Sequence, residues 1–322
     1  MKKIATLVAT VLIAASATAC GADDGGGEDG ATSLLLLSQQ TPFTAPSYFA
    51  EKLGYYDEAN LDVEIRAFPT GTTALEAWKS GIGDVVYSGA QPALLNYGNT
   101  DGTNYRMIQI ATRSEPALIL MANRSITSAK DLEGKKVATR IGSTSEWWLQ
   151  RYLDHNNVDT SKVEIINLDS QQLPPALEIG DIDAFALYQP VGWQSQAVSG
   201  DKVHQLADAT EVPGVSDLTS YGVRPELIEQ NPEAVKAFVE ATKRGADYVV
   251  AHPEEAGEFY ATEFGANNED TVQTIALFDF TPTFDEEAVS MMQDLIDWSV
   301  EHGALTEGFD INDVIWTDAA GR

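Results

Sequence analysis

Four small or hydroxyl-bearing residues have the composition of an anion-binding site. Gly142, Ser143, Thr144 and Ser145 precede a stretch with helical periodicity. Free backbone N–H groups and hydroxyls at such a helix start can bind a carboxylate, sulfonate or phosphate. Ser143 and Glu146 also have the spacing of a capping box, which would satisfy the same N–H groups within the helix. Both interpretations stay open, because a capped helix start can still face a cleft.

Two acidic side chains affect which ligand charge the site would favour. Glu146 lies in the first turn of that helix, where it would satisfy the helix dipole and oppose an anion. Glu115 raises the same question at a segment that we expect to be a hinge. A cationic or neutral ligand is favoured if these side chains face the cleft.

The loops that follow strands supply the remaining candidates, because ligands of open α/β sheets bind beyond the carboxyl ends of the strands. Their aromatic side chains suit an apolar or ring-bearing solute. Since adjacent helix positions point about 100° apart, we assign Trp147 to the cleft and Trp148 to packing. The candidate ligand-binding residues are Phe43, Tyr48, Thr72, Tyr87, Ser88, Gln91, Glu115, Ser143, Thr144, Ser145, Trp147, Tyr188 and Gln189.

No group of residues with the spacing of a catalytic or metal site is found in the sequence. The histidines, His155, His204, His252 and His302, lie outside the selected loops and lack metal-ligand spacing. There is no G-x-S-x-G elbow and no complete P-loop. The sequence therefore predicts a binding protein that is not an enzyme, with no catalytic residue, metal or cofactor.

The elements that would position these loops alternate between short apolar strands and helices. This pattern indicates an α/β fold with mixed sheets flanked by helices. From residue 225 onward the pattern is almost wholly helical, with helices beginning near residues 232, 253 and 285. A capping box at Thr73 and Glu76 would open an earlier helix. Strands are predicted at residues 34–37, 61–65, 84–87, 107–111, 118–121, 136–139, 163–168 and 184–188.

Residues 74–92 and 176–190 share an ordered sequence pattern, which we call the echo. Each begins with Ala-Leu-Glu, continues with a glycine three positions before an aspartate, and ends with Gln-Pro after a strand. This ordered match predicts two lobes that face each other with the same helix–strand–loop unit.

The N-terminus has the order of a bacterial export signal. Lys2 and Lys3 precede an apolar run at residues 4–15, which is shorter than the roughly 20 residues needed to span a bilayer. Small residues then lead to Cys20, the only cysteine, and residues 17–20 resemble a lipoprotein processing site. An ordinary secretory cleavage site is the alternative. We expect a signal peptide at 1–19 and a lipidated Cys20 that opens a flexible acidic and glycine-rich tether over 20–32.

The net charge of the protein restricts the kinds of molecule that it can bind. The net charge is −29, and removal of the two positive charges of Lys2 and Lys3 leaves −31. A protein with this negative net charge repels nucleic acid and anionic lipid, so we expect no nucleic-acid partner. The hydrophobic fraction of 43% still describes a core-forming chain.

Several stretches, in order, resemble the type II periplasmic solute-binding proteins that serve importers of sulfonate, taurine, nitrate and thiamine precursors. The resemblance extends from about residue 34 to about residue 298. The stretches are residues 48–56 leading to 61–63, residues 132–138 followed by Gly142 and Ser143, residues 176–190, and residues 231–235.

The resemblance implies a two-lobed fold with a ligand cleft between the lobes. Lobe 1 would comprise residues 33–114 and 220–322, and lobe 2 the inserted residues 115–219. It further implies a monomeric lipoprotein on the extracytoplasmic face of the cell membrane, whose partners are a small solute and an ABC transporter permease. The solute would be a sulfonate, an aromatic carboxylate or a pyrimidine-like compound. Two alternatives are a ligand sensor for a membrane receptor and an enzyme similar to thiamine-pyrimidine synthases.

Overall fold

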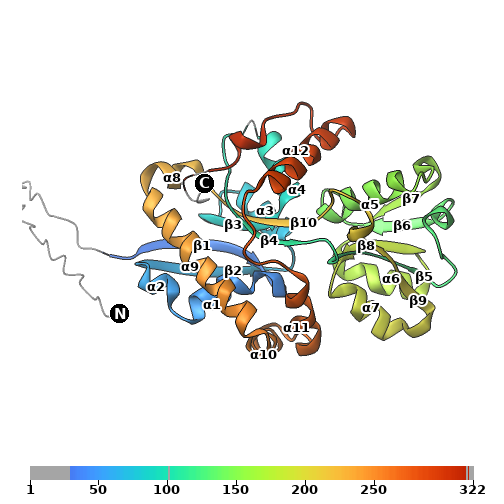
Figure 1. Ribbon diagram of the computed structural model, residues 1–322, viewed down its shortest axis with the longest axis horizontal. Coiled ribbons are helices and arrows are strands. Elements are labelled where there is room, and N and C mark those ends of the chain that lie inside the picture. The colour runs from blue at the N-terminus through green and yellow to red at the C-terminus, as the bar shows by residue number, and fades with distance from the viewer. Residues whose placement is uncertain (1–29, 101, 317, 319–322) are drawn as a thin grey trace, which may run out of the picture. The chain divides into compact units, whose positions relative to one another are not determined.

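The computed structural model describes residues 30–100, 102–316 and 318, and Figure 1 shows their arrangement. Cys20, the predicted signal peptide and most of the predicted tether lie outside the described residues. From Ala31 onward the chain forms one compact unit. Within the described residues, no helix combines the length and apolarity that crossing a membrane requires.

Two five-stranded mixed sheets organise this unit (Figure 1). Sheet A has the order β2-β1-β3-β10-β4 and sheet B the order β7-β6-β8-β5-β9. In each sheet four strands point the same way, and the fifth, β10 or β5, is antiparallel to both of its neighbours. The strands are β1 Thr32–Gln39, β2 Leu61–Phe68, β3 Val85–Gly89, β4 Arg106–Ser114, β5 Leu118–Asn123, β6 Lys136–Thr139, β7 Glu164–Asn167, β8 Ala184–Tyr188, β9 Val203–Asp208 and β10 Asp217–Val223.

All eight predicted strands are present, but β9 and β10 are not among the predicted ones. Strand β10 occupies residues 217–223, which include the expected boundary between lobe 2 and the second part of lobe 1 at residues 219 and 220. Each of its residues is buried, because it lies between β3 and β4 in the interior of sheet A. A strand that is buried on both faces lacks the alternation of apolar and polar residues that marks a half-buried strand.

Helices cover both faces of sheet A (Figure 1). Helices α1, α9 and α10 pack on one face, while α3, α4 and α12 pack on the other. Helix α9 lies close to α1, because a Cβ atom at Gly245 would lie 2.1 Å from the carbonyl oxygen of Pro46. The helices are α1 Ala45–Lys52, α2 Tyr55–Glu58, α3 Gly71–Lys79, α4 Ala90–Gly98, α5 Thr144–His155, α6 Leu173–Ile179, α7 Val191–Ser199, α8 Pro225–Gln230, α9 Pro232–Ala251, α10 Pro253–Phe264, α11 Asn268–Leu277 and α12 Glu286–Glu301.

The two echoing stretches form equivalent units, α3-β3-α4 in sheet A and α6-β8-α7 in sheet B. The repeated aspartate has the same contact in both. Asp84 accepts a hydrogen bond of 2.8 Å from the N–H of Leu35, and Asp183 accepts one of 3.0 Å from the N–H of Lys136. Each aspartate thus joins the start of one parallel strand to its neighbour, which gives a physical reason for the repeated spacing.

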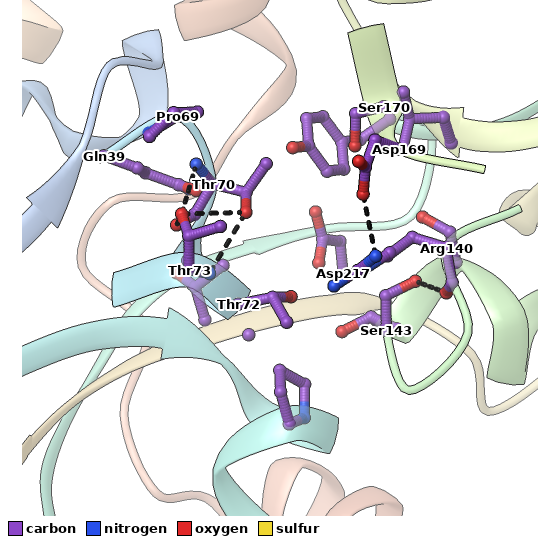
Figure 2. A pocket seen from close by; sticks show the side chains of 18 of the residues that line it. Gln39, Pro69, Thr70, Thr72, Thr73, Arg140, Ser143, Asp169, Ser170 and Asp217 are labelled. Atoms are coloured by element: carbon purple, nitrogen blue, oxygen red, sulfur yellow. Dashed lines mark hydrogen bonds and ion pairs between the residues drawn. The ribbon is translucent and has the colours of Figure 1, made fainter. Parts of the chain in front are cut away.

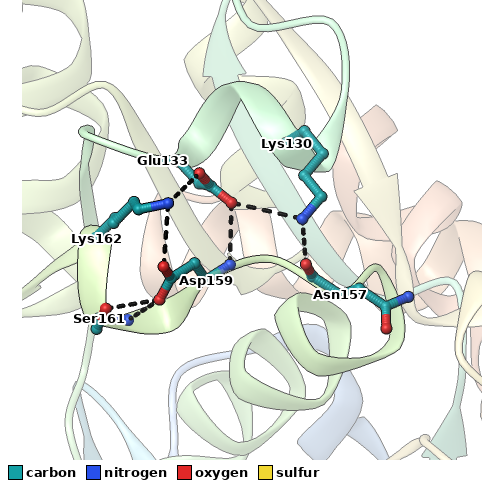
Figure 3. Close-up of polar contacts among 6 residues, drawn as sticks. All are labelled: Lys130, Glu133, Asn157, Asp159, Ser161 and Lys162. Carbon is teal, nitrogen blue, oxygen red and sulfur yellow. Dashed lines mark hydrogen bonds and ion pairs between the residues drawn. The ribbon is translucent and has the colours of Figure 1, made fainter.

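An exposed polar cluster holds the connections around β6 and β7 (Figure 3). Glu133 accepts hydrogen bonds of 3.1 Å from both the backbone N–H of Asp159 and the Nζ of Lys162. Lys162 also pairs with Asp159 at 3.0 Å, and Lys130 contacts Glu133 and the carbonyl oxygen of Asn157. The hydrogen bond from Asp159 and the nearby lysines lower the pKa of Glu133. Since these groups are exposed, the cluster orients the loops and contributes little to stability.

Candidate functional site

A pocket lies between the loops of sheet A and those of sheet B (Figure 2). It encloses about 1040 Å³ of empty space, part of which is open to solvent. Its lining follows the carboxyl ends of parallel strands, with Gln39 at the end of β1, Gly89 at the end of β3, and Arg140 directly after β6. This is the edge at which open α/β sheets bind ligands. We call this space the cleft pocket.

Six of the predicted ligand-binding residues line the cleft pocket: Phe43, Thr72, Ser143, Thr144, Ser145 and Tyr188. Two of them form an aromatic wall that crosses between the two sheets. The rings of Phe43 and Tyr188 are 5.4 Å apart, and their planes are at 87° to each other. This edge-to-face contact is a favourable geometry for aromatic pairs.

The other predicted aromatic residues lie elsewhere. Tyr48 packs against Phe264, with ring centroids 5.4 Å apart, and lines a separate surface groove. Tyr87 is fully buried in sheet A, where its hydroxyl donates a hydrogen bond of 2.8 Å to Oγ1 of Thr219. Trp147 lies in a small apolar space lined by residues of α4, α5, β10 and α12. Its indole therefore joins α5 to the helices of sheet A.

The remaining predicted polar residues are buried or paired outside the lining of the cleft pocket. Ser88 and Gln91 are almost fully buried at the junction of β3 and α4. Gln189 is 2% exposed, and its Nε2 donates to Gln205 at 3.2 Å. The Glu115 carboxylate pairs with the Nε of Arg113 at 3.2 Å.

The start of α5 faces the cleft pocket, but its contacts differ from those of a capping box. Oγ of Ser143 donates a hydrogen bond of 2.6 Å to the carbonyl oxygen of Arg140, and makes no cap. The Glu146 carboxylate accepts from the N–H of Gly142 at 2.7 Å and does not line the pocket. Burial raises the pKa of Glu146. Within the described part of the chain, the N–H groups of the first two helical residues have no acceptor.

A second helix, α3, also begins at the cleft pocket. Its N-cap is Thr70, whose Oγ1 accepts from the N–H of Thr73 at 3.2 Å, so the predicted capping box at Thr73 and Glu76 is wrong by one turn. The helix begins at Gly71, which lies close to β3: a Cβ atom there would be 3.2 Å from the Cα of Ser88. Two helix N-termini with partial positive charge thus face the same space, which favours an anionic group.

Arg140 is the one positively charged side chain among the described residues that line the cleft pocket. Its Nη1 lies 2.7 Å from Oδ1 of Asp169 (Figure 2). Its Nη2 lies 3.5 Å from Oε1 of Glu76. Glu76 belongs to α3 beside sheet A, whereas Arg140 follows β6 of sheet B. The guanidinium group therefore links the two sides of the pocket. Arg140 was not among the predicted ligand-binding residues, because the predicted anion-binding segment begins at Gly142.

Asp217, at the start of β10, places a carboxyl group in the wall of the cleft pocket. Only 4% of the residue is exposed, and burial raises the pKa of its carboxyl from the ordinary 3.8 to about 7. In residues 30–100 and 102–316, no group donates a hydrogen bond to this carboxyl or forms an ion pair with it. Asp217 was not among the predicted ligand-binding residues, because no strand was predicted at residues 217–223.

The two sheets also approach closely beside the pocket. A Cβ atom at Gly89, the N-cap of α4, would lie 2.8 Å from Oγ1 of Thr144 at the start of α5. Glycine is therefore the residue that allows α4 and α5 to meet here.

Comparisons with known proteins agree with this architecture. The taurine-binding periplasmic protein of Escherichia coli (strain K12) is 28% identical over 200 residues, which cover 61% of this chain and 60% of that protein. The 4-amino-5-hydroxymethyl-2-methylpyrimidine phosphate synthase of Legionella pneumophila is 27% identical over 235 residues, which cover 70% of this chain and 71% of that enzyme. Sequence similarity thus extends both to binding proteins and to an enzyme.

Solved structures show the same fold. The periplasmic aliphatic sulphonate binding protein of Escherichia coli superimposes with a TM-score of 0.76 at 19% identity, over 90% of this chain and 99% of that chain. The predicted fold class, two lobes with mixed sheets and flanking helices, is confirmed. The model of the NMT1/THI5-like family matches residues 41–256. The chain belongs to the NMT1/THI5-like family and has the fold of periplasmic binding proteins, as the resemblance in its sequence had indicated.

Proposed function

We propose that this protein is the solute-binding component of an ABC importer and binds a small organic solute in the cleft pocket. The observation that carries the proposal is that loops of both sheets line one pocket at the carboxyl ends of their strands. A solute there touches both halves of the molecule, so binding favours an arrangement in which the halves lie together. The taurine- and sulphonate-binding relatives support transport as the role of this arrangement.

The proposed lobes are residues 33–114 with 220–322, and residues 115–219. Two connections would form the hinge, one between β4 and β5 and the other between β9 and β10. Two chain segments permit bending while they limit twisting. The proposed anchor is a lipid on Cys20, which would hold a monomer at the extracytoplasmic face of the membrane near its permease.

The polar lining favours a solute with an anionic group, such as a sulfonate or carboxylate. The starts of α3 and α5 present N–H groups and hydroxyls, and Arg140 adds a positive charge that Asp169 and Glu76 share. Phe43 and Tyr188 offer an aromatic surface for an apolar or ring-shaped part of the same solute. A pyrimidine-like compound remains a third candidate.

Two alternative functions, an enzyme and a sensor, predict different observations. A synthase-like enzyme would need reactive groups at the pocket, but its described lining contains no cysteine or histidine. A sensor for a membrane receptor would bind the solute in the same way. Permease and ATPase genes beside this one favour transport, whereas a lone sensor kinase gene favours sensing.

A thermal-shift screen of the purified mature protein against sulfonates, carboxylates and pyrimidines tests the proposal. A solute at a hundredfold excess over its Kd adds about 2.7 kcal/mol to the free energy of unfolding, which raises Tm by several degrees. Arg140→Gln should weaken binding of an anionic hit. Arg66→Gln, an exposed control paired with Glu64 on β2, should leave it unchanged.

Small-angle scattering provides an independent measurement of lobe closure. We expect the radius of gyration to fall when a hit from the screen is added at saturation. An unchanged radius at saturation, or a panel without any hit, would contradict the proposal.

A further inference from the structure

The Asp217 carboxyl is a buried acid that the described part of the protein leaves without a partner. A carboxylate that is removed from water without a donor or counter-ion costs several kcal/mol. Other aspartates in the sheets avoid this cost. Asp84 and Asp183 each accept a backbone N–H, at 2.8 Å and 3.0 Å.

The groups around Asp217 are already engaged with other partners. The guanidinium group of Arg140 pairs with Asp169 and Glu76. Thr219, two positions along β10, accepts from the hydroxyl of Tyr87 and shares a hydrogen bond of 2.6 Å with Thr112. No described group donates a hydrogen bond to the Asp217 carboxyl, and this carboxyl lines the cleft pocket, so a solute in the pocket can supply the missing partner.

The position of Asp217 fits a contact with a bound molecule. Figure 2 shows it between Thr70, Thr72 and Thr73 on one side and Arg140 and Ser143 on the other. The helix starts that favour an anion thus lie in the same pocket as an unpaired carboxyl. An anionic group and a cationic group on one molecule would satisfy both parts of this lining.

We propose that the cleft pocket selects a zwitterionic solute, whose cationic nitrogen binds the Asp217 carboxylate while its anionic group binds at the starts of α3 and α5. This inference rests on the proposed solute-binding function and specifies the class of solute. An ammonium group supplies up to three N–H donors and the positive charge that a buried carboxylate lacks. The aliphatic part between the two charged groups would lie against Phe43 and Tyr188.

Matched pairs of solutes test the inference by isothermal titration calorimetry at pH 8 with the mature protein. Taurine is compared with propane-1-sulfonate, and 4-aminobutanoate with pentanoate, so that each pair exchanges an ammonium group for a methyl group. We expect the ammonium member of at least one pair to bind tenfold or more tightly, since a hydrogen bond to a charged group contributes about 1.5–3 kcal/mol.

The variant Asp217→Asn should lose this preference for ammonium and keep the affinity for the methyl member. Asp181→Asn, which changes an exposed aspartate outside the pocket lining, is the matched control and should retain the wild-type preference. Thermal unfolding of each variant verifies that it is folded. If Asp217→Asn does not fold, the difference in affinity within each pair of solutes, measured on the wild-type protein, still tests the inference.

The outcomes separate this inference from the proposed function. Equal affinities within both pairs, or an unchanged preference in folded Asp217→Asn, overturn the inference and leave solute binding intact. Failure of all four solutes to bind also overturns it. The proposed function is lost only if the wider panel of sulfonates, carboxylates and pyrimidines fails as well.

Discussion

Replacing Asp217 with asparagine should change how the stability of the ligand-free protein depends on pH. Burial raises the pKa of this carboxyl from 3.8 to about 7 in the folded protein. In the unfolded chain the carboxyl is exposed and recovers its ordinary pKa. The folded state therefore holds a proton at pH values where the unfolded state has already lost it.

The sign of the effect follows from this difference in proton binding. The contribution of the carboxyl to stability is fully present below the unfolded pKa and is lost as the pH rises through the folded pKa. Between pH 5 and pH 8, a folded pKa of about 7 corresponds to a loss of ~2.5 kcal/mol in the free energy of unfolding. Asparagine has no proton to lose, so the variant should not show this loss.

The tyrosines near Asp217 do not obscure this difference in pH dependence between the wild-type protein and Asp217→Asn. Burial raises the pKa of Tyr188 to about 12, and that of Tyr87 is also raised by burial, so both stay neutral in this range. Arg140 and Asp169 remain paired in both proteins.

Urea unfolding measured by circular dichroism at pH 5, 6, 7 and 8 provides the assay. The wild-type protein and the Asp181→Asn control should lose ~2.5 kcal/mol more than Asp217→Asn between pH 5 and pH 8. An identical pH dependence for Asp217→Asn and wild type would refute the reasoning, because it would mean that the carboxyl is ionised or solvated in the folded protein.

Two further substitutions test the packing that positions the cleft pocket. Gly245→Ala should destabilise the protein by about 1–3 kcal/mol or more, because the added methyl group would lie 2.1 Å from the carbonyl oxygen of Pro46. Thermal unfolding measures the loss, and Gly308→Ala, whose Cβ would meet nothing nearer than 3.8 Å, is the control; equal Tm values for both variants would contradict close packing of α9 on α1. Trp147→Ala should cost about 3–5 kcal/mol in urea unfolding, since it leaves a cavity where α5 meets α12. A loss below 1 kcal/mol would place the indole outside the core.

Much of the fold could be predicted from the sequence, because its strands and helices have strong local patterns. The echo between residues 74–92 and 176–190 indicated two similar units, and both units contain the aspartate contact that the spacing requires. Strands β9 and β10 were missed for different reasons. β10 has no alternation of apolar and polar residues. β9, at the edge of sheet B, has His204 and Gln205 between Val203 and Leu206, so its apolar residues are neither continuous nor strictly alternating.

The site was harder to predict, because a sequence pattern places a loop but not the direction of its side chains. Tyr87 in β3 and Tyr188 at the end of β8 each precede a Gln-Pro pair, yet Tyr188 lines the pocket whereas Tyr87 is buried and bonds to Thr219 of β10. Asp217 and Arg140 are far apart in the sequence and line the same pocket only because of the sheet topology. The burial that makes Asp217 an unusual acid is a property of its surroundings and has no counterpart in local composition.

The close approach of Thr144 to Gly89 limits which residues position 89 can hold. Oγ1 of Thr144 lies where a side chain at position 89 would begin, so even a methyl group there would act as a wedge between α4 and α5. A residue larger than glycine at position 89 would therefore require Thr144 or one of the two helices to shift. Gly89 and Thr144 both line the cleft pocket, so a larger side chain at position 89 would hold the two halves of the protein apart at the pocket itself.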